Sequence, residues 1–274
     1  MSKYFKENGV FYEFEVKRDP YPLNPREEYE NIGHMMIWKR GCSLGDENEY
    51  DTPYDFIYEM LEKYVEEEKV VEYAKKGAKS VHLEYYDDDE CWYLYDYEDI
   101  CITDSKTDTE MVSDIIYALS MLSIQDSLTL LGYADIVIMP LYIYEHSGMT
   151  ISCADGYPYN DRWDGGQFGW IWTDRESVEK TCGGYLEDGN FIRLSDENWR
   201  TCAQQSLISE VKEYDQYLQG DCYGYTLSAL KDGEFVEVDS VWGFYSDNWG
   251  DTLYEELAKE VTLSKLHDTL EQAV

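Results

Sequence analysis

Apolar and polar residues alternate in some stretches of this chain and recur at helical spacing in others. Over 10–17 every second residue is apolar, which is the period of a strand with one buried face. The prolines of 19–25 interrupt this pattern and indicate a loop. From Pro53 onward apolar residues recur every three or four positions, and Lys75-Lys76-Gly77 is typical of a helix end. The pattern therefore predicts a strand, a loop and one helix over about 53–76.

The remaining sequence mixes the same two periods. Helices are expected over about 109–131, 196–219 and 251–271, with a short one after the capping-box sequence Thr173-Asp174-Arg175-Glu176. Strands are expected over 81–97 (two strands around the turn Asp87–Glu90), 135–144, 167–172, and 222–230 and 234–245 as a hairpin across Lys231-Asp232-Gly233. Hairpin-connected strands with alternating faces favour an α+β fold, a mainly antiparallel sheet packed with several helices. No linker divides the chain, so we expect a single domain over 1–274.

The composition adds an extreme negative charge to this picture. The 274 residues include 58 Asp and Glu against 22 Lys and Arg, a formal charge of −36. Because 43% of the residues are hydrophobic and 16% are aromatic, the chain has enough apolar surface for a core and is not a disordered acidic tail. Such a charge costs self-repulsion in the compact state, so it serves solubility or attracts a cationic partner.

The acidic residues are concentrated in particular segments. Residues 81–145 contain fifteen acids and a single base, Lys106. Along the expected first helix, Glu59, Glu62 and Glu66 are three or four positions apart and would be neighbours on its outer side. Proteins that grip nucleic acid have basic grooves, and carboxylates at this spacing could replace phosphates there. A solvated acidic face without a partner is the alternative, and the sequence leaves both open.

Segment 81–99 is the strongest candidate for a contact surface, because it combines carboxylates with aromatic rings. The carboxylates could face Lys and Arg of a partner while the rings stack on guanidinium groups. The candidate partner-binding residues are Glu62, Glu66, Glu84, Asp87, Asp88, Asp89, Glu90, Tyr93, Tyr95, Asp96, Glu98 and Asp99.

Catalytic and cofactor chemistry has weaker support. His146 and Asp164 would lie side by side if the strands ending near them pair, yet no G-x-S-x-G elbow and no phosphate-binding loop are present. The run Asp87–Glu90 lacks the spacing of a calcium loop. We therefore expect no catalytic residue, no metal and no cofactor.

Cysteine usage and the N-terminus suggest a cytoplasmic setting. The seven cysteines form no C-x-x-C pair, which favours reduced thiols over a zinc site or a disulfide framework. Residues 1–7 do not resemble a signal peptide, no uncharged run is long enough for a membrane span, and the charge disfavours anionic lipid and nucleic acid as direct ligands.

Several motifs resemble, in order, a largely uncharacterised family of proteins carried by bacteriophages, plasmids and integrative elements. They are Asn24-Pro25-Arg26-Glu27 leading into 31–35 and 38–46, then the segments 139–148, 161–169, 210–220 with 223–225, and 239–245. The resemblance covers about 10–250, with 84–107 as an insertion or protruding segment, and Gly165 stands where a serine is common. It implies a mobile-element origin and a cytoplasmic setting, and carries no catalytic residue over.

Three hypotheses follow from charge and resemblance together. The first is a non-enzymatic inhibitor of a bacterial anti-phage defence nuclease that acts as an acidic nucleic-acid mimic, with a nucleic-acid-binding host protein as its partner. The second is a small metal-dependent or hydrolytic enzyme centred on His146 and Asp164. The third is a structural or accessory phage protein with a solubilising acidic surface. The sequence leaves a homo-oligomer open.

Overall fold

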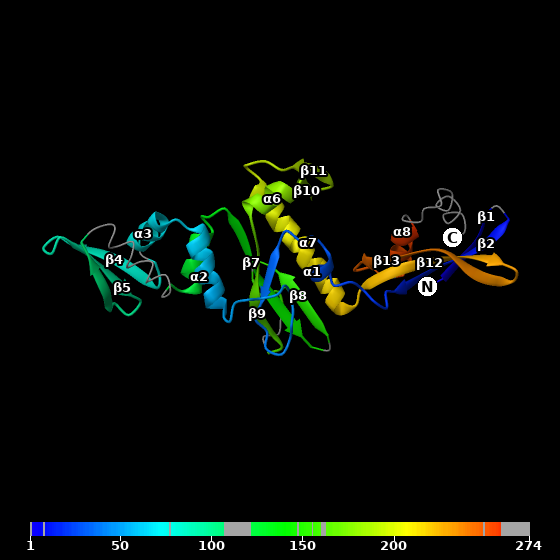
Figure 1. Ribbon diagram of the computed structural model, residues 1–274, viewed down its shortest axis with the longest axis horizontal. Helices are drawn as coiled ribbons and strands as arrows, with labels where there is room; N and C mark the ends of the chain where they lie inside the picture. The colour runs from blue at the N-terminus through cyan, green and yellow to red at the C-terminus, as the bar shows by residue number, and fades with distance from the viewer. Residues whose placement is uncertain are drawn as a thin grey trace.

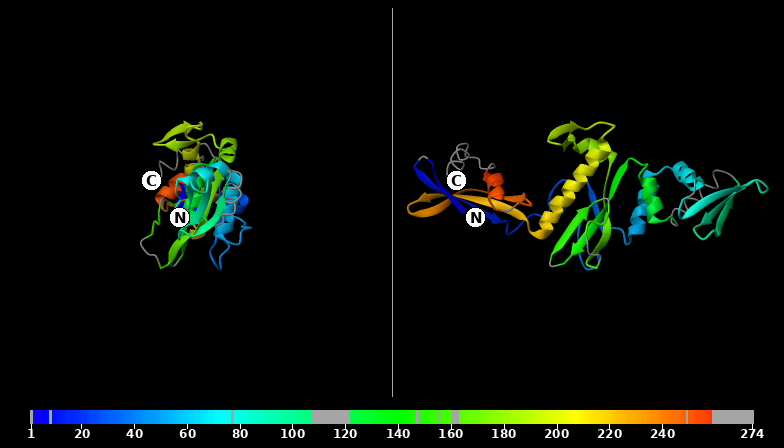
Figure 2. Two further views of the ribbon diagram at one scale, coloured as in Figure 1. Left: turned by 90° about the vertical axis from the view of Figure 1, so that its left-hand side faces the viewer. Right: turned by 180° about the vertical axis from the view of Figure 1, so that it is seen from behind.

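Three antiparallel sheets follow one another along the longest axis of the molecule (Figure 1). The structure is a computed structural model that describes residues 2–7, 9–76, 78–106, 122–146, 148–154, 156–159, 163–248 and 250–258. The end-on view in Figure 2 shows a narrow cross-section, so the molecule is elongated. Helices pack against the antiparallel sheets, which confirms the predicted α+β class.

The terminal sheet joins the two ends of the described chain. Its strand order is β1 (Ser2–Glu7), β2 (Val10–Arg18), β12 (Cys222–Lys231) and β13 (Glu234–Tyr245). The hairpin between the last two strands is confirmed, because Asp232 and Gly233 have φ of 54° and 90° as its tight turn requires. Helix α8 (Asp251–Ala258) buries Leu253 and Leu257 with Phe14 of this sheet. The predicted continuation of that helix to 271 lies outside the described residues.

The central sheet is covered by helices on both faces. Its strand order is β3 (His34–Ile37), β9 (Gly165–Asp174), β7 (Ile136–Glu145) and β8 (Met149–Cys153). The long helix α7 (Trp199–Gln219) covers one face and buries Leu207 and Val211 against it, and Gly220 ends this helix in the left-handed conformation. The shorter elements around it are α1 (Pro25–Glu28), α6 (Arg175–Thr181) and the hairpin of β10 (Gly184–Glu187) and β11 (Asn190–Arg193).

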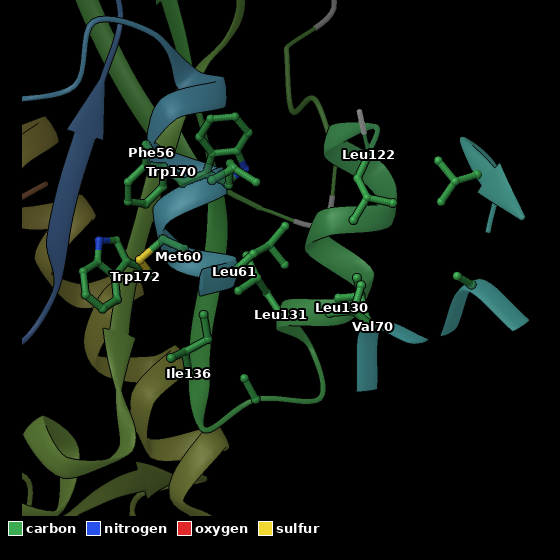
Figure 3. Close-up of a cluster of buried hydrophobic side chains, with 14 of the residues drawn as sticks. Phe56, Met60, Leu61, Val70, Leu122, Leu130, Leu131, Ile136, Trp170 and Trp172 are labelled. Carbon is green, nitrogen blue, oxygen red and sulfur yellow. The ribbon is translucent and has the colours of Figure 1, made fainter. Parts of the chain in front are cut away.

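The second face of the central sheet carries the connection to the third sheet. Helices α2 (Pro53–Tyr64) and α5 (Ile124–Leu131) pack on this face, where Leu61 and Leu131 meet the indole of Trp170 in one buried cluster (Figure 3). The third sheet, called the tip sheet, consists of β4 (Val81–Tyr86), β5 (Cys91–Asp96) and β6 (Cys101–Ser105), with α3 (Glu67–Lys75) against it. The same buried cluster extends into the tip sheet through Leu94.

The prediction of one helix over 53–76 is wrong. The chain is extended at Val65 (φ −112°, ψ 121°) and Glu66 (φ −65°, ψ 139°), so α2 and α3 are separate helices. The break lets Tyr64 pack on the indole of Trp172 in the central sheet, 5.8 Å between ring centroids. It also frees α3 to turn toward β4. Two different packing partners therefore override a continuous helical pattern.

Two other helix starts differ from the sequence expectation in detail. The N-cap of α6 is Asp174, one residue later than predicted, and its side chain accepts a hydrogen bond from the N–H of Ser177. The predicted capping box does not form, because the third helical residue is then Ser177 and not Glu176. Thr173 is buried in β9 instead, and its hydroxyl donates to the carbonyl of Ile32. Ser123 caps α5, and the earlier part of the predicted helix 109–131 falls outside the described residues.

The motifs around Arg26 form a buried ion-pair network. The Arg26 side chain is 2% exposed and donates two hydrogen bonds to Asp46, one to Glu210 and one to the carbonyl of Gly33. Glu210 in turn accepts from the N–H of Ile32, and Asp46 accepts from that of Met35. The network ties α1, β3 and α7 together, so these residues hold the fold. The prediction of a single domain over 1–274, with 84–107 as an insertion, stays a prediction.

Within the described residues, no helix is both long enough and apolar enough to cross a lipid bilayer.

Candidate partner-binding surface

The register of the tip sheet separates its side chains onto two faces. Directly paired residues point the same way, and the pairs His82 with Tyr95, Glu84 with Tyr93 and Tyr86 with Cys91 alternate with more apolar pairs. The alternate face carries Val81, Leu83 and Leu94, which are buried against the helices. The first face, called here the tyrosine face, is defined by His82, Glu84, Tyr86, Tyr93 and Tyr95.

The aromatic rings of the tyrosine face form a continuous row. The rings of His82 and Tyr95 stack with centroids 5.2 Å apart, Tyr95 and Tyr93 are 6.4 Å apart, and Tyr93 meets Tyr86 edge-on at 5.2 Å. Tyr86 is exposed, and the other three rings are partly accessible. A row of rings with accessible faces is a platform on which planar groups can stack.

Carboxylates border this row and accept hydrogen bonds from its phenols. Tyr86 donates to Glu84 at 2.9 Å, and Tyr93 donates to Asp89 at 3.1 Å. The pKa of Tyr86 is raised by its hydrogen bond with Tyr95 and next by Glu84, while the hydrogen bond to Asp89 raises the pKa of Tyr93. Both phenols are therefore neutral at physiological pH, and the negative charge of the face resides on its carboxylates.

Two turns place more carboxylates at the two ends of the strands. Asp87, Asp88, Asp89 and Glu90 form the exposed turn between β4 and β5, as predicted, with Glu90 at φ 51°. At the opposite end, Asp96 accepts hydrogen bonds from the N–H groups of Glu98 and Ile100 and so fixes the turn to β6. A carboxylate oxygen of Asp99, in this turn, lies 3.8 Å from the Nε2 of His82. The structure thus brings Glu84, Asp89 and Asp99 to the tyrosine face.

Other predicted contact residues lie apart from this face. Glu62 is on α2, where its carboxylate bonds to Tyr58, and Glu66 lies in the extended break before α3. Glu59 and Glu62 are three positions apart on α2 as predicted, but Glu66 does not continue their row because the helix ends at Tyr64. Sequence reasoning did not place His82 and Tyr86 on the tyrosine face, although the four-residue turn fixes which positions pair across the hairpin.

A buried carboxylate anchors the tip sheet to the helices. Asp126 of α5 is 1% exposed and accepts hydrogen bonds from the N–H and hydroxyl of Ser80, from Tyr73 and from the N–H of Lys79. Burial alone would raise the pKa of Asp126, but these hydrogen bonds outweigh it and the pKa lies below its usual value. Ser80 directly precedes β4, so this network holds the first strand of the tip sheet.

The tip sheet has little compensation for its negative charge. Residues 81–106 contain nine acids and one lysine, Lys106, and the carboxylates of Glu84 and Asp99 lie 3.9 and 3.8 Å from the Nε2 of His82. Lys75 lies over the ring of Trp92, 4.5 Å from its centroid, on the opposite face. The tyrosine face therefore combines accessible rings with an excess of carboxylates, and such a surface attracts cations that can also stack, above all guanidinium groups.

His146 and Asp164 lie together, because the two strands that end near them pair. β7 pairs with β9, and the Nδ1 of His146 is 2.9 Å from a carboxylate oxygen of Asp164. The His146 side chain is 70% exposed, which leaves Nε2 accessible to solvent. In this contact the carboxylate of Asp164 orients the imidazole of His146, as in an acid–base pair. Ser147 and residues 160–162 lie outside the described residues. Within the described residues, no cluster of three metal-ligating side chains exists.

Comparisons with protein families, with curated proteins and with solved structures each gave no match for this chain.

Proposed function

We propose that this protein is a non-enzymatic, mobile-element-encoded inhibitor that occupies the nucleic-acid-binding groove of a bacterial defence nuclease in the cytoplasm. The tyrosine face carries the proposal, because its accessible rings lie beside carboxylates in a sheet whose acids far outnumber its bases. Nuclease grooves present Lys and Arg to phosphates and often aromatic side chains or arginines to bases. Carboxylates can replace the phosphates in such a groove, and tyrosine rings can replace the bases.

The shape of the molecule supports the same proposal. An elongated body with a narrow cross-section can enter a groove that normally holds a nucleic-acid strand or duplex (Figure 2). The tip sheet lies at one end of this body and shares a hydrophobic cluster with the helices that lead to the centre (Figures 1 and 3). A partner could therefore surround the tip sheet while the other two sheets remain outside.

The test is restriction of phage growth in hosts that carry a defence nuclease. Expression of this protein should restore plating of a restricted phage in at least one host of a panel with different nucleases. A variant with Asp87→Asn, Asp88→Asn, Asp89→Asn and Glu90→Gln should restore plating less, because these substitutions remove four negative charges from the tip sheet and change its shape little. The matched control neutralises Glu187, Asp188, Asp232 and Glu234, four exposed acids of two other hairpins.

The protein immobilised on a resin should also retain the sensitive nuclease from lysate and release it to duplex DNA. Retention that DNA does not displace, or equal activity of the tip-sheet variant and the wild type, would contradict the proposal.

The contact between His146 and Asp164 keeps an enzyme as the second candidate function. In that case His146→Ala should abolish phage rescue while leaving the free energy of unfolding within about 0.5 kcal/mol of the wild type, since the side chain is exposed. Under the inhibitor proposal the same variant retains its activity.

A further inference from the structure

A groove runs along the central sheet where one strand has no neighbour. β8 pairs with residues 141–145 of β7, so among the described residues the first half of β7, 136–140, has no strand on that side. The groove there has a volume of about 350 Å³. Its walls are Leu128 of α5, Ile138 and Pro140 of β7, Trp170 of β9, and Arg200 and Gln204 of α7.

Arg200 lines this groove and has no carboxylate partner among the described residues. Its guanidinium donates hydrogen bonds to the carbonyls of Ile136, at 2.7 Å, and Ala134, and lies 4.5 Å from the ring centroid of Trp199. These contacts fix its position at the groove. A guanidinium has five N–H donors, so three remain for a ligand.

The free edge of β7 is poorly suited to an added peptide strand. Pro140 has no N–H group, and Arg200 already occupies the carbonyl of Ile136. Only Ile138 can offer both a donor and an acceptor along this edge. Such features protect edges from strand addition, so the groove favours a compact ligand over an extended peptide.

We propose that this groove binds a small amphipathic carboxylate, independently of the inhibitor function. Its apolar body would lie against Leu128, Ile138 and Pro140, and its carboxylate would accept hydrogen bonds from Arg200. Planar, charge-assisted pairing of this kind is the strongest recognition that an arginine offers. Gln204 adds an amide at the rim, and the volume is in the range of small-molecule sites.

Trp170, which lines the groove, carries an unused hydrogen-bond donor. Its N–H is buried and has no hydrogen-bond acceptor among the described residues. An unsatisfied buried donor costs about 1–3 kcal/mol, which a ligand oxygen within its reach would recover. The net charge of the protein opposes an anion at long range, but salt screens this repulsion beyond about 8 Å at physiological ionic strength.

Binding can be measured by calorimetry and by ligand-observed NMR on the full chain. The probes are 3-phenylpropionate, indole-3-propionate and octanoate, each compared with its neutral amide. We expect at least one carboxylate to bind with a Kd at least tenfold lower than that of its amide. Arg200→Gln should abolish this preference and leave the amide's own Kd unchanged.

A second variant keeps the test informative if Arg200→Gln disturbs the fold. Gln204→Trp fills the groove from an exposed helix position, and Gln205→Trp, exposed and outside the groove lining, is its control. Loss of binding in the first variant alone supports the site. No binding by any of the three carboxylates, equal binding of acid and amide, or unchanged binding in Gln204→Trp would each overturn the proposal.

Discussion

Replacement of Asp126 by alanine should loosen the tip sheet from the rest of the protein. The carboxylate accepts hydrogen bonds from both polar groups of Ser80, which is itself 8% exposed, and from Tyr73 and Lys79. Each buried donor that loses its acceptor costs about 1–3 kcal/mol. The hydroxyl of Ser80 can rotate to another acceptor, but its backbone N–H cannot. We therefore expect Asp126→Ala to lower the free energy of unfolding by about 2–4 kcal/mol.

The stability that Asp126→Ala loses should depend on pH, and the direction follows from the pKa of Asp126. The pKa of Asp126 is lowered in the folded state, so its stabilising contribution is complete above the unfolded value of about 3.9. The contribution disappears as pH falls through the folded pKa. The difference between wild type and Asp126→Ala should therefore be constant at neutral pH and shrink in acid below about pH 4.

Urea unfolding and hydrogen exchange together measure this effect. Exchange should accelerate first at the amides of Lys79 and Ser80 and then along β4, while the amides of β7 and β9 keep their protection. Asp51→Asn, a change at an exposed carboxylate, is the control and should alter the unfolding free energy by less than about 0.5 kcal/mol. Equal stability and equal exchange in Asp126→Ala and the wild type would refute the anchoring role.

Two further predictions concern other parts of the molecule. Arg26→Met should cost about 3–5 kcal/mol in urea unfolding, because it leaves the carboxylates of Asp46 and Glu210 without their buried cation; a loss below about 1 kcal/mol would contradict this. Iodoacetamide at neutral pH should label exposed Cys101 before Cys202 and Cys222, because burial raises the pKa of both thiols to about 11. Peptide mass spectrometry gives the order, and early labelling of Cys222 would be inconsistent with the buried position.

Much of the architecture could be predicted from local patterns. The hairpin at Asp232-Gly233 followed from turn chemistry. Strand periodicity predicted the two strands near His146 and Asp164 but left their pairing as a condition, which the structure shows to be met. The break at Val65 could not be predicted, because the apolar spacing continues through it and the two helices separate only to reach different sheets.

The candidate site was predicted in composition but not in geometry. The sequence contains the acids and rings of the tip sheet, yet only the cross-strand register assigns Tyr86, Tyr93 and Tyr95 to one face. The distant partners of Arg26 show the same limit, since Glu210 is 184 positions away in the sequence. Contacts of this separation depend on tertiary packing, which a local pattern does not contain.

The salt dependence of binding to the captured nuclease tests the central claim most directly. For wild type, the logarithm of the affinity should fall linearly with the logarithm of salt concentration, as for nucleic acid itself. The variant neutralised at Asp87, Asp88, Asp89 and Glu90 should bind at least tenfold more weakly, about 1.4 kcal/mol, with a smaller salt slope. The variant neutralised at Glu187, Asp188, Asp232 and Glu234 should resemble the wild type. An affinity that is independent of salt, or unchanged in the tip-sheet variant, would contradict acidic mimicry.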